Sequence, residues 1–184
     1  MATYVGLDPR RDINWVTVSD AVADAAALLA EVKIDAFVAF PPVAQDARAK
    51  KLGHVVVNSA VDRPWSQYFC CMIIGRRDFV RQNPVATKRA MRAILKTADL
   101  CALAPERQAR ALVDKGWGKQ YEYAFQMMQD LPYGRWRDFS PEDTVRFYAL
   151  RLREAGLIKS SPQKLIDEGT DWRFVNELKK ELKA

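Results

Sequence analysis

The stretch that decides the fold reads Gln67-Tyr-Phe-Cys-Cys-Met-Ile-Ile-Gly75. An almost continuous apolar run of this length predicts a strand over 67–75 that is covered on both faces, as in α/β sheets. The next residues predict a short helix and then a longer helix that begins at Asn83-Pro84. An asparagine at the N-cap accepts a hydrogen bond from an unpaired backbone N–H, and a proline at the first helical position has no N–H to satisfy.

The residues before this stretch alternate between strand and helix patterns. In chain order, the predicted elements are a strand over 13–17, a helix from Ser19 or Asp20 to about Val32, a strand over 36–40, a short helix over 43–51 and a strand over 54–57. Such alternation predicts a parallel sheet with helical crossovers. A loop over 58–66, the crossing loop, then leads into the strand 67–75.

The residues after Gly75 are helical by pattern. Helices are predicted over 84–103, 106–115, 119–130 and 140–155, with another near the end of the chain. The helix 140–155 has the clearest boundaries. Ser140 is placed to cap its N-terminus, Pro141 takes the first helical position, and Gly156 follows its last residue.

Three motifs, in order along the chain, resemble periplasmic solute-binding proteins of the nitrate/sulfonate/taurine class, which includes thiamine-precursor binders. The motifs are Lys33-Ile-Asp-Ala-Phe-Val-Ala-Phe-Pro-Pro42, Gly75-Arg-Arg-Asp-Phe79 with Asn83-Pro84, and Tyr133-Gly-Arg-Trp136 with Ser140-Pro-Glu-Asp143. The resemblance implies an α/β fold of the type II periplasmic-binding-protein kind. Residues 1–62 would form part of the second lobe, and residues 63–184 would form the return segment and the helical C-terminal part of the first lobe.

The first residues also match this class. Gly6-Leu-Asp-Pro9 has the pattern of a helix exit, and a helix of only about five residues before it is not stable by itself in water. The resemblance therefore implies that the chain is the C-terminal portion of a longer periplasmic protein whose signal peptide is lost. We expect an exposed apolar surface, and weak or no ligand binding by these 184 residues alone.

The charge pattern indicates which classes of binding partner the chain favours. The net charge is +6, and residues 61–184 carry 23 basic and 16 acidic side chains. The two signs are interleaved, which is typical of solvated helix faces. No clustered basic module indicates nucleic-acid binding, whereas a positive balance helps to attract an anionic ligand. The longest apolar run, Phe69 to Ile74, is far shorter than the roughly 20 residues of a membrane span, so we expect membrane contact only through a partner.

The sequence offers no catalytic motif. It has no glycine-rich phosphate loop and no hydrolase or metalloprotease signature. The three cysteines lack metal-ligand spacing. On a strand, Cys70 and Cys71 would point to opposite faces, and with Cys101 they are interpreted as small buried hydrophobic residues. The single histidine, His54, is interpreted as structural. We therefore predict no enzyme activity, no cofactor and no metal.

Ligand-binding candidates lie where predicted strands end, because open α/β sheets bind ligands there. The candidates are Asp20, Phe40, Pro41, Arg63, Trp65 and Tyr68. Trp65 and Tyr68 can stack on a ligand or donate to it, and Arg63 can pair with an anionic group. Phe40 is either an apolar wall of the site or a core residue. Asp20 is either a ligand contact or a helix cap.

The resemblance implies a function without covalent chemistry. The chain would be the substrate-binding component of an ABC importer, which captures a small anionic or heteroaromatic solute by closure of two lobes and then docks on a membrane permease. One alternative is an enzyme on the same fold, similar to thiamine-pyrimidine synthases. Those enzymes have a cysteine-rich motif, and Cys70-Cys71 of this chain matches it only in part. The other is a truncated interaction module with no role in transport.

Overall fold

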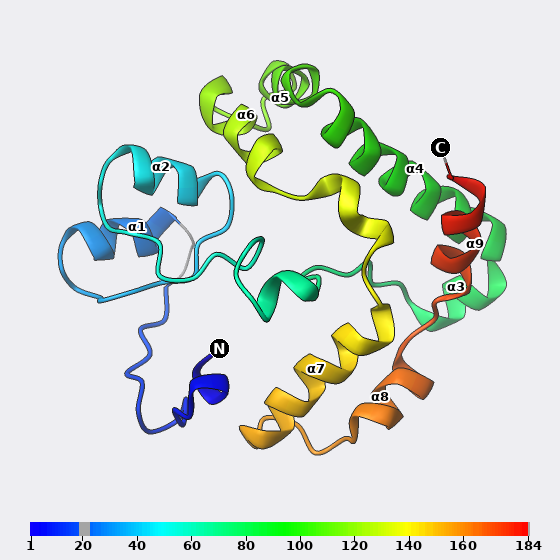
Figure 1. Ribbon diagram of the computed structural model, residues 1–184, viewed down its shortest axis with the longest axis horizontal. Helices are drawn as coiled ribbons and strands as arrows, with labels where there is room; N and C mark the ends of the chain where they lie inside the picture. Colours follow the sequence, from blue (N-terminus) through cyan, green and yellow to red (C-terminus); the bar gives the residue numbers. More distant parts are fainter. Residues whose placement is uncertain (19–22, 184) are drawn as a thin grey trace.

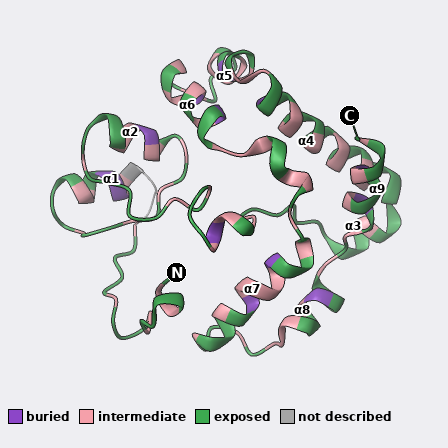
Figure 2. Ribbon diagram, in the orientation of Figure 1, coloured by how far each residue is buried: buried purple, intermediate pink, exposed green. Residues whose placement is uncertain are grey.

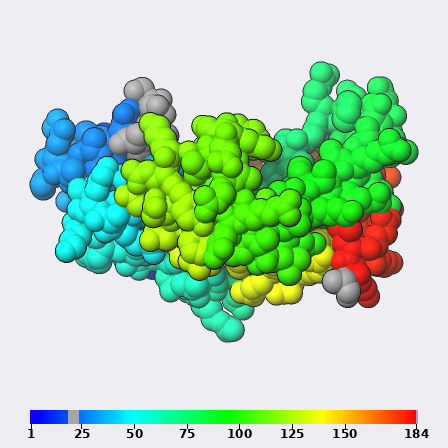
Figure 3. All heavy atoms as spheres, turned by 90° about the horizontal axis from the view of Figure 1, so that it is seen from above, coloured from blue at the N-terminus to red at the C-terminus, as the bar shows by residue number. Residues whose placement is uncertain are grey.

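The computed structural model describes residues 1–18 and 23–183, which form helices joined by long extended segments (Figure 1). In chain order, with η for a 3₁₀ helix, the elements are η1 (Ala2–Val5), α1 (Ala23–Ala30), α2 (Val43–Ala49), η2 (Trp65–Gln67), α3 (Arg77–Gln82), α4 (Pro84–Leu103), α5 (Pro105–Asp114), α6 (Tyr121–Asp130), η3 (Tyr133–Arg137), α7 (Pro141–Glu154), α8 (Pro162–Gly169) and α9 (Arg173–Glu181). Figure 3 shows the part of the chain that contains α1 and α2 at one end of the molecule and α9 at the other.

The helices predicted after Gly75 are confirmed. Helices α4, α5, α6 and α7 lie where the pattern places them, with ends that differ by at most two residues. Four of the helices, α4, α5, α7 and α8, have proline in the first turn. Proline is favourable there because the N–H that it lacks would have no partner inside the helix. Local chain chemistry therefore sets these boundaries.

The two predicted N-caps have different outcomes. Ser140 caps α7 as expected, since its side chain accepts a hydrogen bond from the Asp143 N–H at 3.3 Å, and Gly156 follows α7 with φ of 65°. Asn83 does precede α4, but its side chain does not cap that helix. Instead its amide donates to the Phe79 carbonyl at 3.2 Å and so ends α3. The predicted boundary at Asn83 is right and the predicted mechanism is wrong.

Replacing Ser140 by alanine is expected to lower the free energy of unfolding by about 1 kcal/mol, because the Asp143 N–H loses its partner. Urea denaturation measures the difference. The matched control is Ser160→Ala, since the Ser160 side chain makes no hydrogen bond to the other described residues. Equal stability of the two variants would contradict the capping role.

The predicted strands do not form a sheet here. Residues 13–17, 36–40 and 54–57 run as extended or bent chain, Gln67 belongs to η2, and the described part of the chain contains no strand. A strand needs a neighbour that pairs with its backbone N–H and C=O groups, and among the described residues no backbone hydrogen bond joins two of these segments. The strand-helix alternation of the α/β prediction is therefore not seen, although both short helices, α2 and α3, are present.

Because these segments are unpaired, their apolar side chains are exposed. Val38, Val56 and Ile74 all face solvent, and Ile74 is 91% exposed. The buried residues are few and scattered over several helices (Figure 2). The predicted exposed apolar surface is confirmed.

The largest buried cluster lies where α4, α5 and α6 meet. Its centre consists of Cys101, Ala109, Ala124 and Met128, surrounded by partly buried apolar residues of α5, α6 and η3. The two alanines let the helix backbones approach closely, and Met128 fills the remaining irregular space. Cys101 is buried here, as predicted. This cluster orients α4 and the chain that follows α6.

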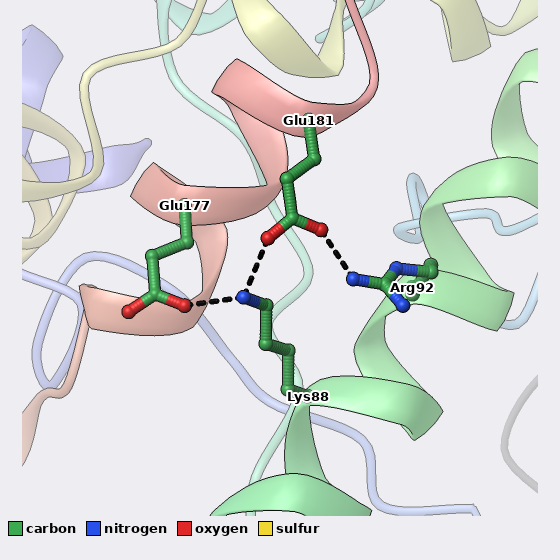
Figure 4. Close-up of polar contacts among 4 residues, drawn as sticks. All are labelled: Lys88, Arg92, Glu177 and Glu181. Carbon is green, nitrogen blue, oxygen red and sulfur yellow. Dashed lines mark hydrogen bonds and ion pairs between the residues drawn. The ribbon is translucent and has the colours of Figure 1, made fainter.

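Helix α9 packs on α4 through apolar and charged contacts. The Leu178 side chain of α9 is fully buried. Beside it, Lys88 of α4 donates to Glu177 at 2.5 Å and to Glu181 at 2.6 Å, and Arg92 also pairs with Glu181 (Figure 4). Charge pairs at the surface stabilise only modestly, so burial of Leu178 is the main reason that α9 stays on α4.

Candidate functional site

A polar hollow of about 710 Å³ lies between the crossing loop, η3 and the start of α7. Its walls include three arginines from different parts of the chain, a tyrosine and the serine that caps α7. We name it the basic hollow, defined by Arg63, Tyr68, Arg135, Ser140 and Arg146.

Aromatic packing positions the crossing loop beside this hollow. The Trp65 ring in η2 is only 6% exposed. It packs edge-on against Tyr4 of η1 and Phe147 of α7, with ring centroids 5.3 Å and 5.6 Å away. Edge-to-face pairs of this kind stabilise beyond the area they bury. Trp65 therefore anchors the loop, with Arg63 two residues before the anchor.

Tyr68 forms the apolar side of the hollow. Its ring stacks on Phe147 with centroids 4.1 Å apart and planes at 12°. The stack holds the tyrosine in place and leaves it half-buried at the wall. A tyrosine held this way offers both a flat ring and a hydroxyl group to a bound molecule.

The other two arginines approach from η3 and α7. Arg135 Nε donates to Asp138 Oδ2 at 3.1 Å, and Arg146 Nη1 donates to Gln163 Oε1 at 3.3 Å. The walls also carry Asp138 and Asp143, so the arginines exceed the carboxylates by one. The hollow also lies at the N-terminal end of α7, where the helix dipole is positive. Its electrostatic character favours an anion.

A partly buried polar contact holds η3 in place next to Arg135. Arg137 donates to both carboxylate oxygens of Asp99, at 2.6 Å and 2.8 Å, and to the Leu182 carbonyl at 2.7 Å. Trp136 Nε1 also donates to Asp99 at 2.8 Å. The hydrogen bonds from Arg137, and then from Trp136, hold the pKa of Asp99 below its ordinary value. The same pairing raises the pKa of Arg137.

The six candidate ligand-binding residues do not all lie at the basic hollow. Arg63 and Tyr68 line the basic hollow together. Trp65 is buried against Tyr4 and Phe147 and does not line the basic hollow, so the structure shows a packing role for it, and its ligand contact stays a prediction. Phe40 is 54% exposed, and neither Phe40 nor Pro41 lines the basic hollow. These two residues were expected at the end of a paired strand, which does not form. Asp20 lies outside the described residues.

Sequence reasoning missed Arg135 and Arg146. The motif Tyr133-Gly-Arg-Trp136 contributes to the family resemblance but names no ligand contact, and Arg146 falls among the interleaved charges that are typical of solvated helix faces. Only the excess of basic residues in 61–184 indicated them. Their meeting with Arg63, more than seventy positions before them, depends on tertiary structure.

A second, larger cavity is mostly apolar. It has a volume of about 1060 Å³ and lies between the extended segment 69–75, α4, η3 and the start of α9. We name it the apolar groove, defined by Phe69, Ile73, Met91, Leu95, Trp136 and Phe174. Its lining also includes charged side chains, namely Arg77, Arg81, Arg173 and Lys179 with Asp167, Glu168 and Asp171. Most of its surface is nevertheless apolar, whereas the surface of the basic hollow is mainly polar, so the basic hollow is the better candidate for recognition of a small charged solute.

Two further tests of the structure bear on function. Over residues 1–18 and 23–183, no helix combines the length and apolar character needed to cross a membrane. Within the same residues, no group of three or more His, Cys, Asp or Glu side chains is arranged to hold a metal ion.

Comparison with known families identifies the class. A family model described as the NMT1-like family matches residues 2–114, which is more than half of the chain. The chain therefore belongs to the NMT1-like family, which is associated with ABC-transporter solute-binding proteins and implies a periplasmic-binding-protein fold and work with a transporter permease. Comparison with curated proteins finds no match, and comparison with solved structures finds none either. The matched region contains Arg63 and Tyr68, and it ends before Arg135 and Arg146.

Proposed function

We propose that this chain contributes to the capture of a small anionic solute for an ABC importer in the periplasm, without covalent chemistry. The observation that carries the proposal is the basic hollow, where Arg63, Arg135 and Arg146 meet at the positive end of α7. Family membership supports the transport role. Nitrate and organic sulfonates are the solutes that this charge pattern fits best, because guanidinium groups form paired hydrogen bonds with flat or three-oxygen anions.

The proposed mechanism is closure of two parts of the chain around the solute. All residues that line the basic hollow belong to 63–184, and Arg63 and Tyr68 lie next to the junction with residues 1–62. Closure of residues 1–62 over the hollow would therefore bring the second part of the chain to the solute. A ligand that contacts both parts stabilises the closed arrangement by its higher affinity for that state. The Tyr68–Phe147 stack provides a flat surface for a solute that also has a ring.

Binding by the 184-residue chain is expected to be weak, with a Kd in the order of millimolar, because part of the arginine charge is already paired within the chain. An NMR titration with a small sulfonate, a nitrate salt and a neutral pyrimidine measures it. Arg63→Gln and Arg146→Gln are each expected to weaken sulfonate binding about tenfold, which is about 1.4 kcal/mol. Affinity should fall with added salt, since the groups are partly exposed.

The matched control is Arg153→Gln, because Arg153 is an exposed arginine of α7 that does not line the hollow. It should leave the sulfonate affinity unchanged. Two results would contradict the proposed site: preference for the neutral pyrimidine over both anions, or equal loss in all three variants. Nanomolar affinity would contradict the expectation that the 184-residue chain binds weakly.

A further inference from the structure

The extended segment that borders the apolar groove brings two cysteines together. The Sγ atoms of Cys70 and Cys71 lie 3.3 Å apart, and both residues are exposed. This corrects the expectation that the two side chains point to opposite faces and are buried. The expectation assumed a strand; instead the chain bends at Cys70, so both sulfurs fall on one side.

The bend has aromatic contacts immediately before it. Tyr68 stacks on Phe147 at 4.1 Å, and Phe69 packs edge-on against Phe139 with centroids 6.0 Å apart. Helix α3 begins at Arg77, six residues after Cys71. The approach of the two sulfurs is therefore part of the packed structure around α7.

We propose that Cys70 and Cys71 are a redox-active pair, which a small disulfide such as glutathione disulfide converts into a reversible disulfide between adjacent residues. Of the three cysteines, these two are exposed, whereas Cys101 is buried between α4, α5 and α6. The two cysteines that are exposed to solvent are thus also the two whose sulfur atoms contact each other.

The reaction balances as two thiol–disulfide exchanges. The Cys71 thiolate attacks one sulfur of glutathione disulfide, the S–S bond of that molecule breaks, and one glutathione thiolate leaves. The Cys70 sulfur then attacks Cys71 in the mixed disulfide, and the second glutathione leaves. The two cysteines are oxidised, the glutathione disulfide is reduced, and the two protons end on two glutathione thiols.

Cys70 can act in the second step because its sulfur lies 3.3 Å from that of Cys71. Partial burial, together with the hydrogen bond to Cys71, raises the pKa of Cys70 to about 11. A raised pKa leaves less thiolate on Cys70 at neutral pH, so its attack on the mixed disulfide depends on the close approach of the two sulfurs. Cys71 lines the apolar groove and is reached from that side.

The bond should be easy to reverse. Consecutive Cα atoms are about 3.8 Å apart, which is less than the roughly 4.4–6.8 Å found for most disulfides. Strained and exposed disulfides are the labile ones. Closure of the ring would fix the Cys71 side chain at the rim of the apolar groove, so the redox state would alter the shape of that cavity.

The test uses the full chain, treated with excess glutathione disulfide in native buffer and then alkylated in urea. After trypsin, Cys70 and Cys71 lie in the peptide 52–76, whereas Cys101 lies in 97–107. We expect peptide 52–76 to carry no alkyl group and to have lost the mass of two hydrogen atoms. Dithiothreitol before alkylation should restore two alkylated cysteines. Free thiols per chain should fall from three to one.

Variants separate the steps. Cys70→Ser should keep glutathione on Cys71, and Cys71→Ser should form the adduct on Cys70 more slowly, because burial raises the pKa of Cys70 and leaves less thiolate. Cys101→Ser should still form the bond between Cys70 and Cys71. Oxidation in urea should be slower, because the unfolded chain does not hold the sulfurs together. Both cysteines still alkylated, a stable glutathione adduct on the wild type, disulfide-linked dimers, or equal rates with and without urea would each overturn the proposal.

Discussion

Replacing Leu178 by alanine is expected to lower the free energy of unfolding by about 2–5 kcal/mol. Leu178 is 0% exposed and is the largest fully buried apolar side chain of the described residues. The substitution removes buried methyl groups and leaves a cavity between α9 and α4 that the surrounding charged pairs cannot fill. Total stability of a domain is only about 5–15 kcal/mol, so α9 should detach or the chain should unfold at low urea.

Urea denaturation followed by circular dichroism measures the change, with the slope of the transition checked for constancy. The control is Leu103→Ala, the same substitution at the end of α4, where the side chain is 81% exposed. That variant should differ from wild type by less than about 0.5 kcal/mol. Similar losses in both variants would mean that Leu178 does not hold α9 on α4.

Replacing Asp99 by asparagine is expected to cost about 1.5–3 kcal/mol at pH 7, because hydrogen bonds to a charged partner are the stronger kind. The variant removes the negative charge of the carboxylate that accepts hydrogen bonds from both Arg137 and Trp136. It should also loosen η3 and thereby move Arg135 in the basic hollow. Urea denaturation measures the stability, and the NMR signal of Arg135 Nε–H reports the loosening.

The same pair predicts a pH dependence with a definite sign. The pKa of Asp99 is lower in the folded chain than its ordinary value of 3.8. The folded state therefore binds its proton more weakly than the unfolded state, and the stabilisation is complete above the ordinary value. It is lost as the pH falls below that value and through the lower folded pKa. The difference between wild type and Asp99→Asn should shrink between neutral and strongly acid pH.

Asp138→Asn is the control for that pH series. Asp138 also accepts from an arginine of η3, at 3.1 Å, but it lies at the exposed surface. Its loss should change stability by less than about 1 kcal/mol at any pH. A constant difference between wild type and Asp99→Asn from pH 7 down to pH 2 would mean that the Asp99 charge does not stabilise the fold.

The boundaries of the later helices were readable in the sequence because their signals are local. A proline fixes its own φ angle and lacks a backbone N–H, and a glycine tolerates a positive φ. These properties of Pro84, Pro141 and Gly156 need no distant partner. Ser140 reaches only three residues along the chain. Helix hydrogen bonds also close within four residues, so a short window of sequence contains the whole interaction.

The predicted strands, in contrast, are not formed among the residues that the structure describes. Residues 36–40 and 67–75 have the apolar composition of buried strands, but a strand is completed only by the backbone of another segment. Without that pairing, the bend at Cys70 places Cys70 and Cys71 side by side, which no alternation rule anticipates. For the same reason Phe40 and Pro41 are not brought to the basic hollow.

The sequence by itself indicated the coarse family and the boundaries of helices α4 to α7, and it named Arg63 and Tyr68, which line the basic hollow, as ligand-binding candidates. Only the tertiary structure decided that Trp65 anchors the loop from behind and that Arg135 and Arg146 complete the basic hollow. The reason is the range of the forces involved. Capping and turn preferences act over three or four residues, whereas a charged hollow is made by side chains that come together only when distant helices pack.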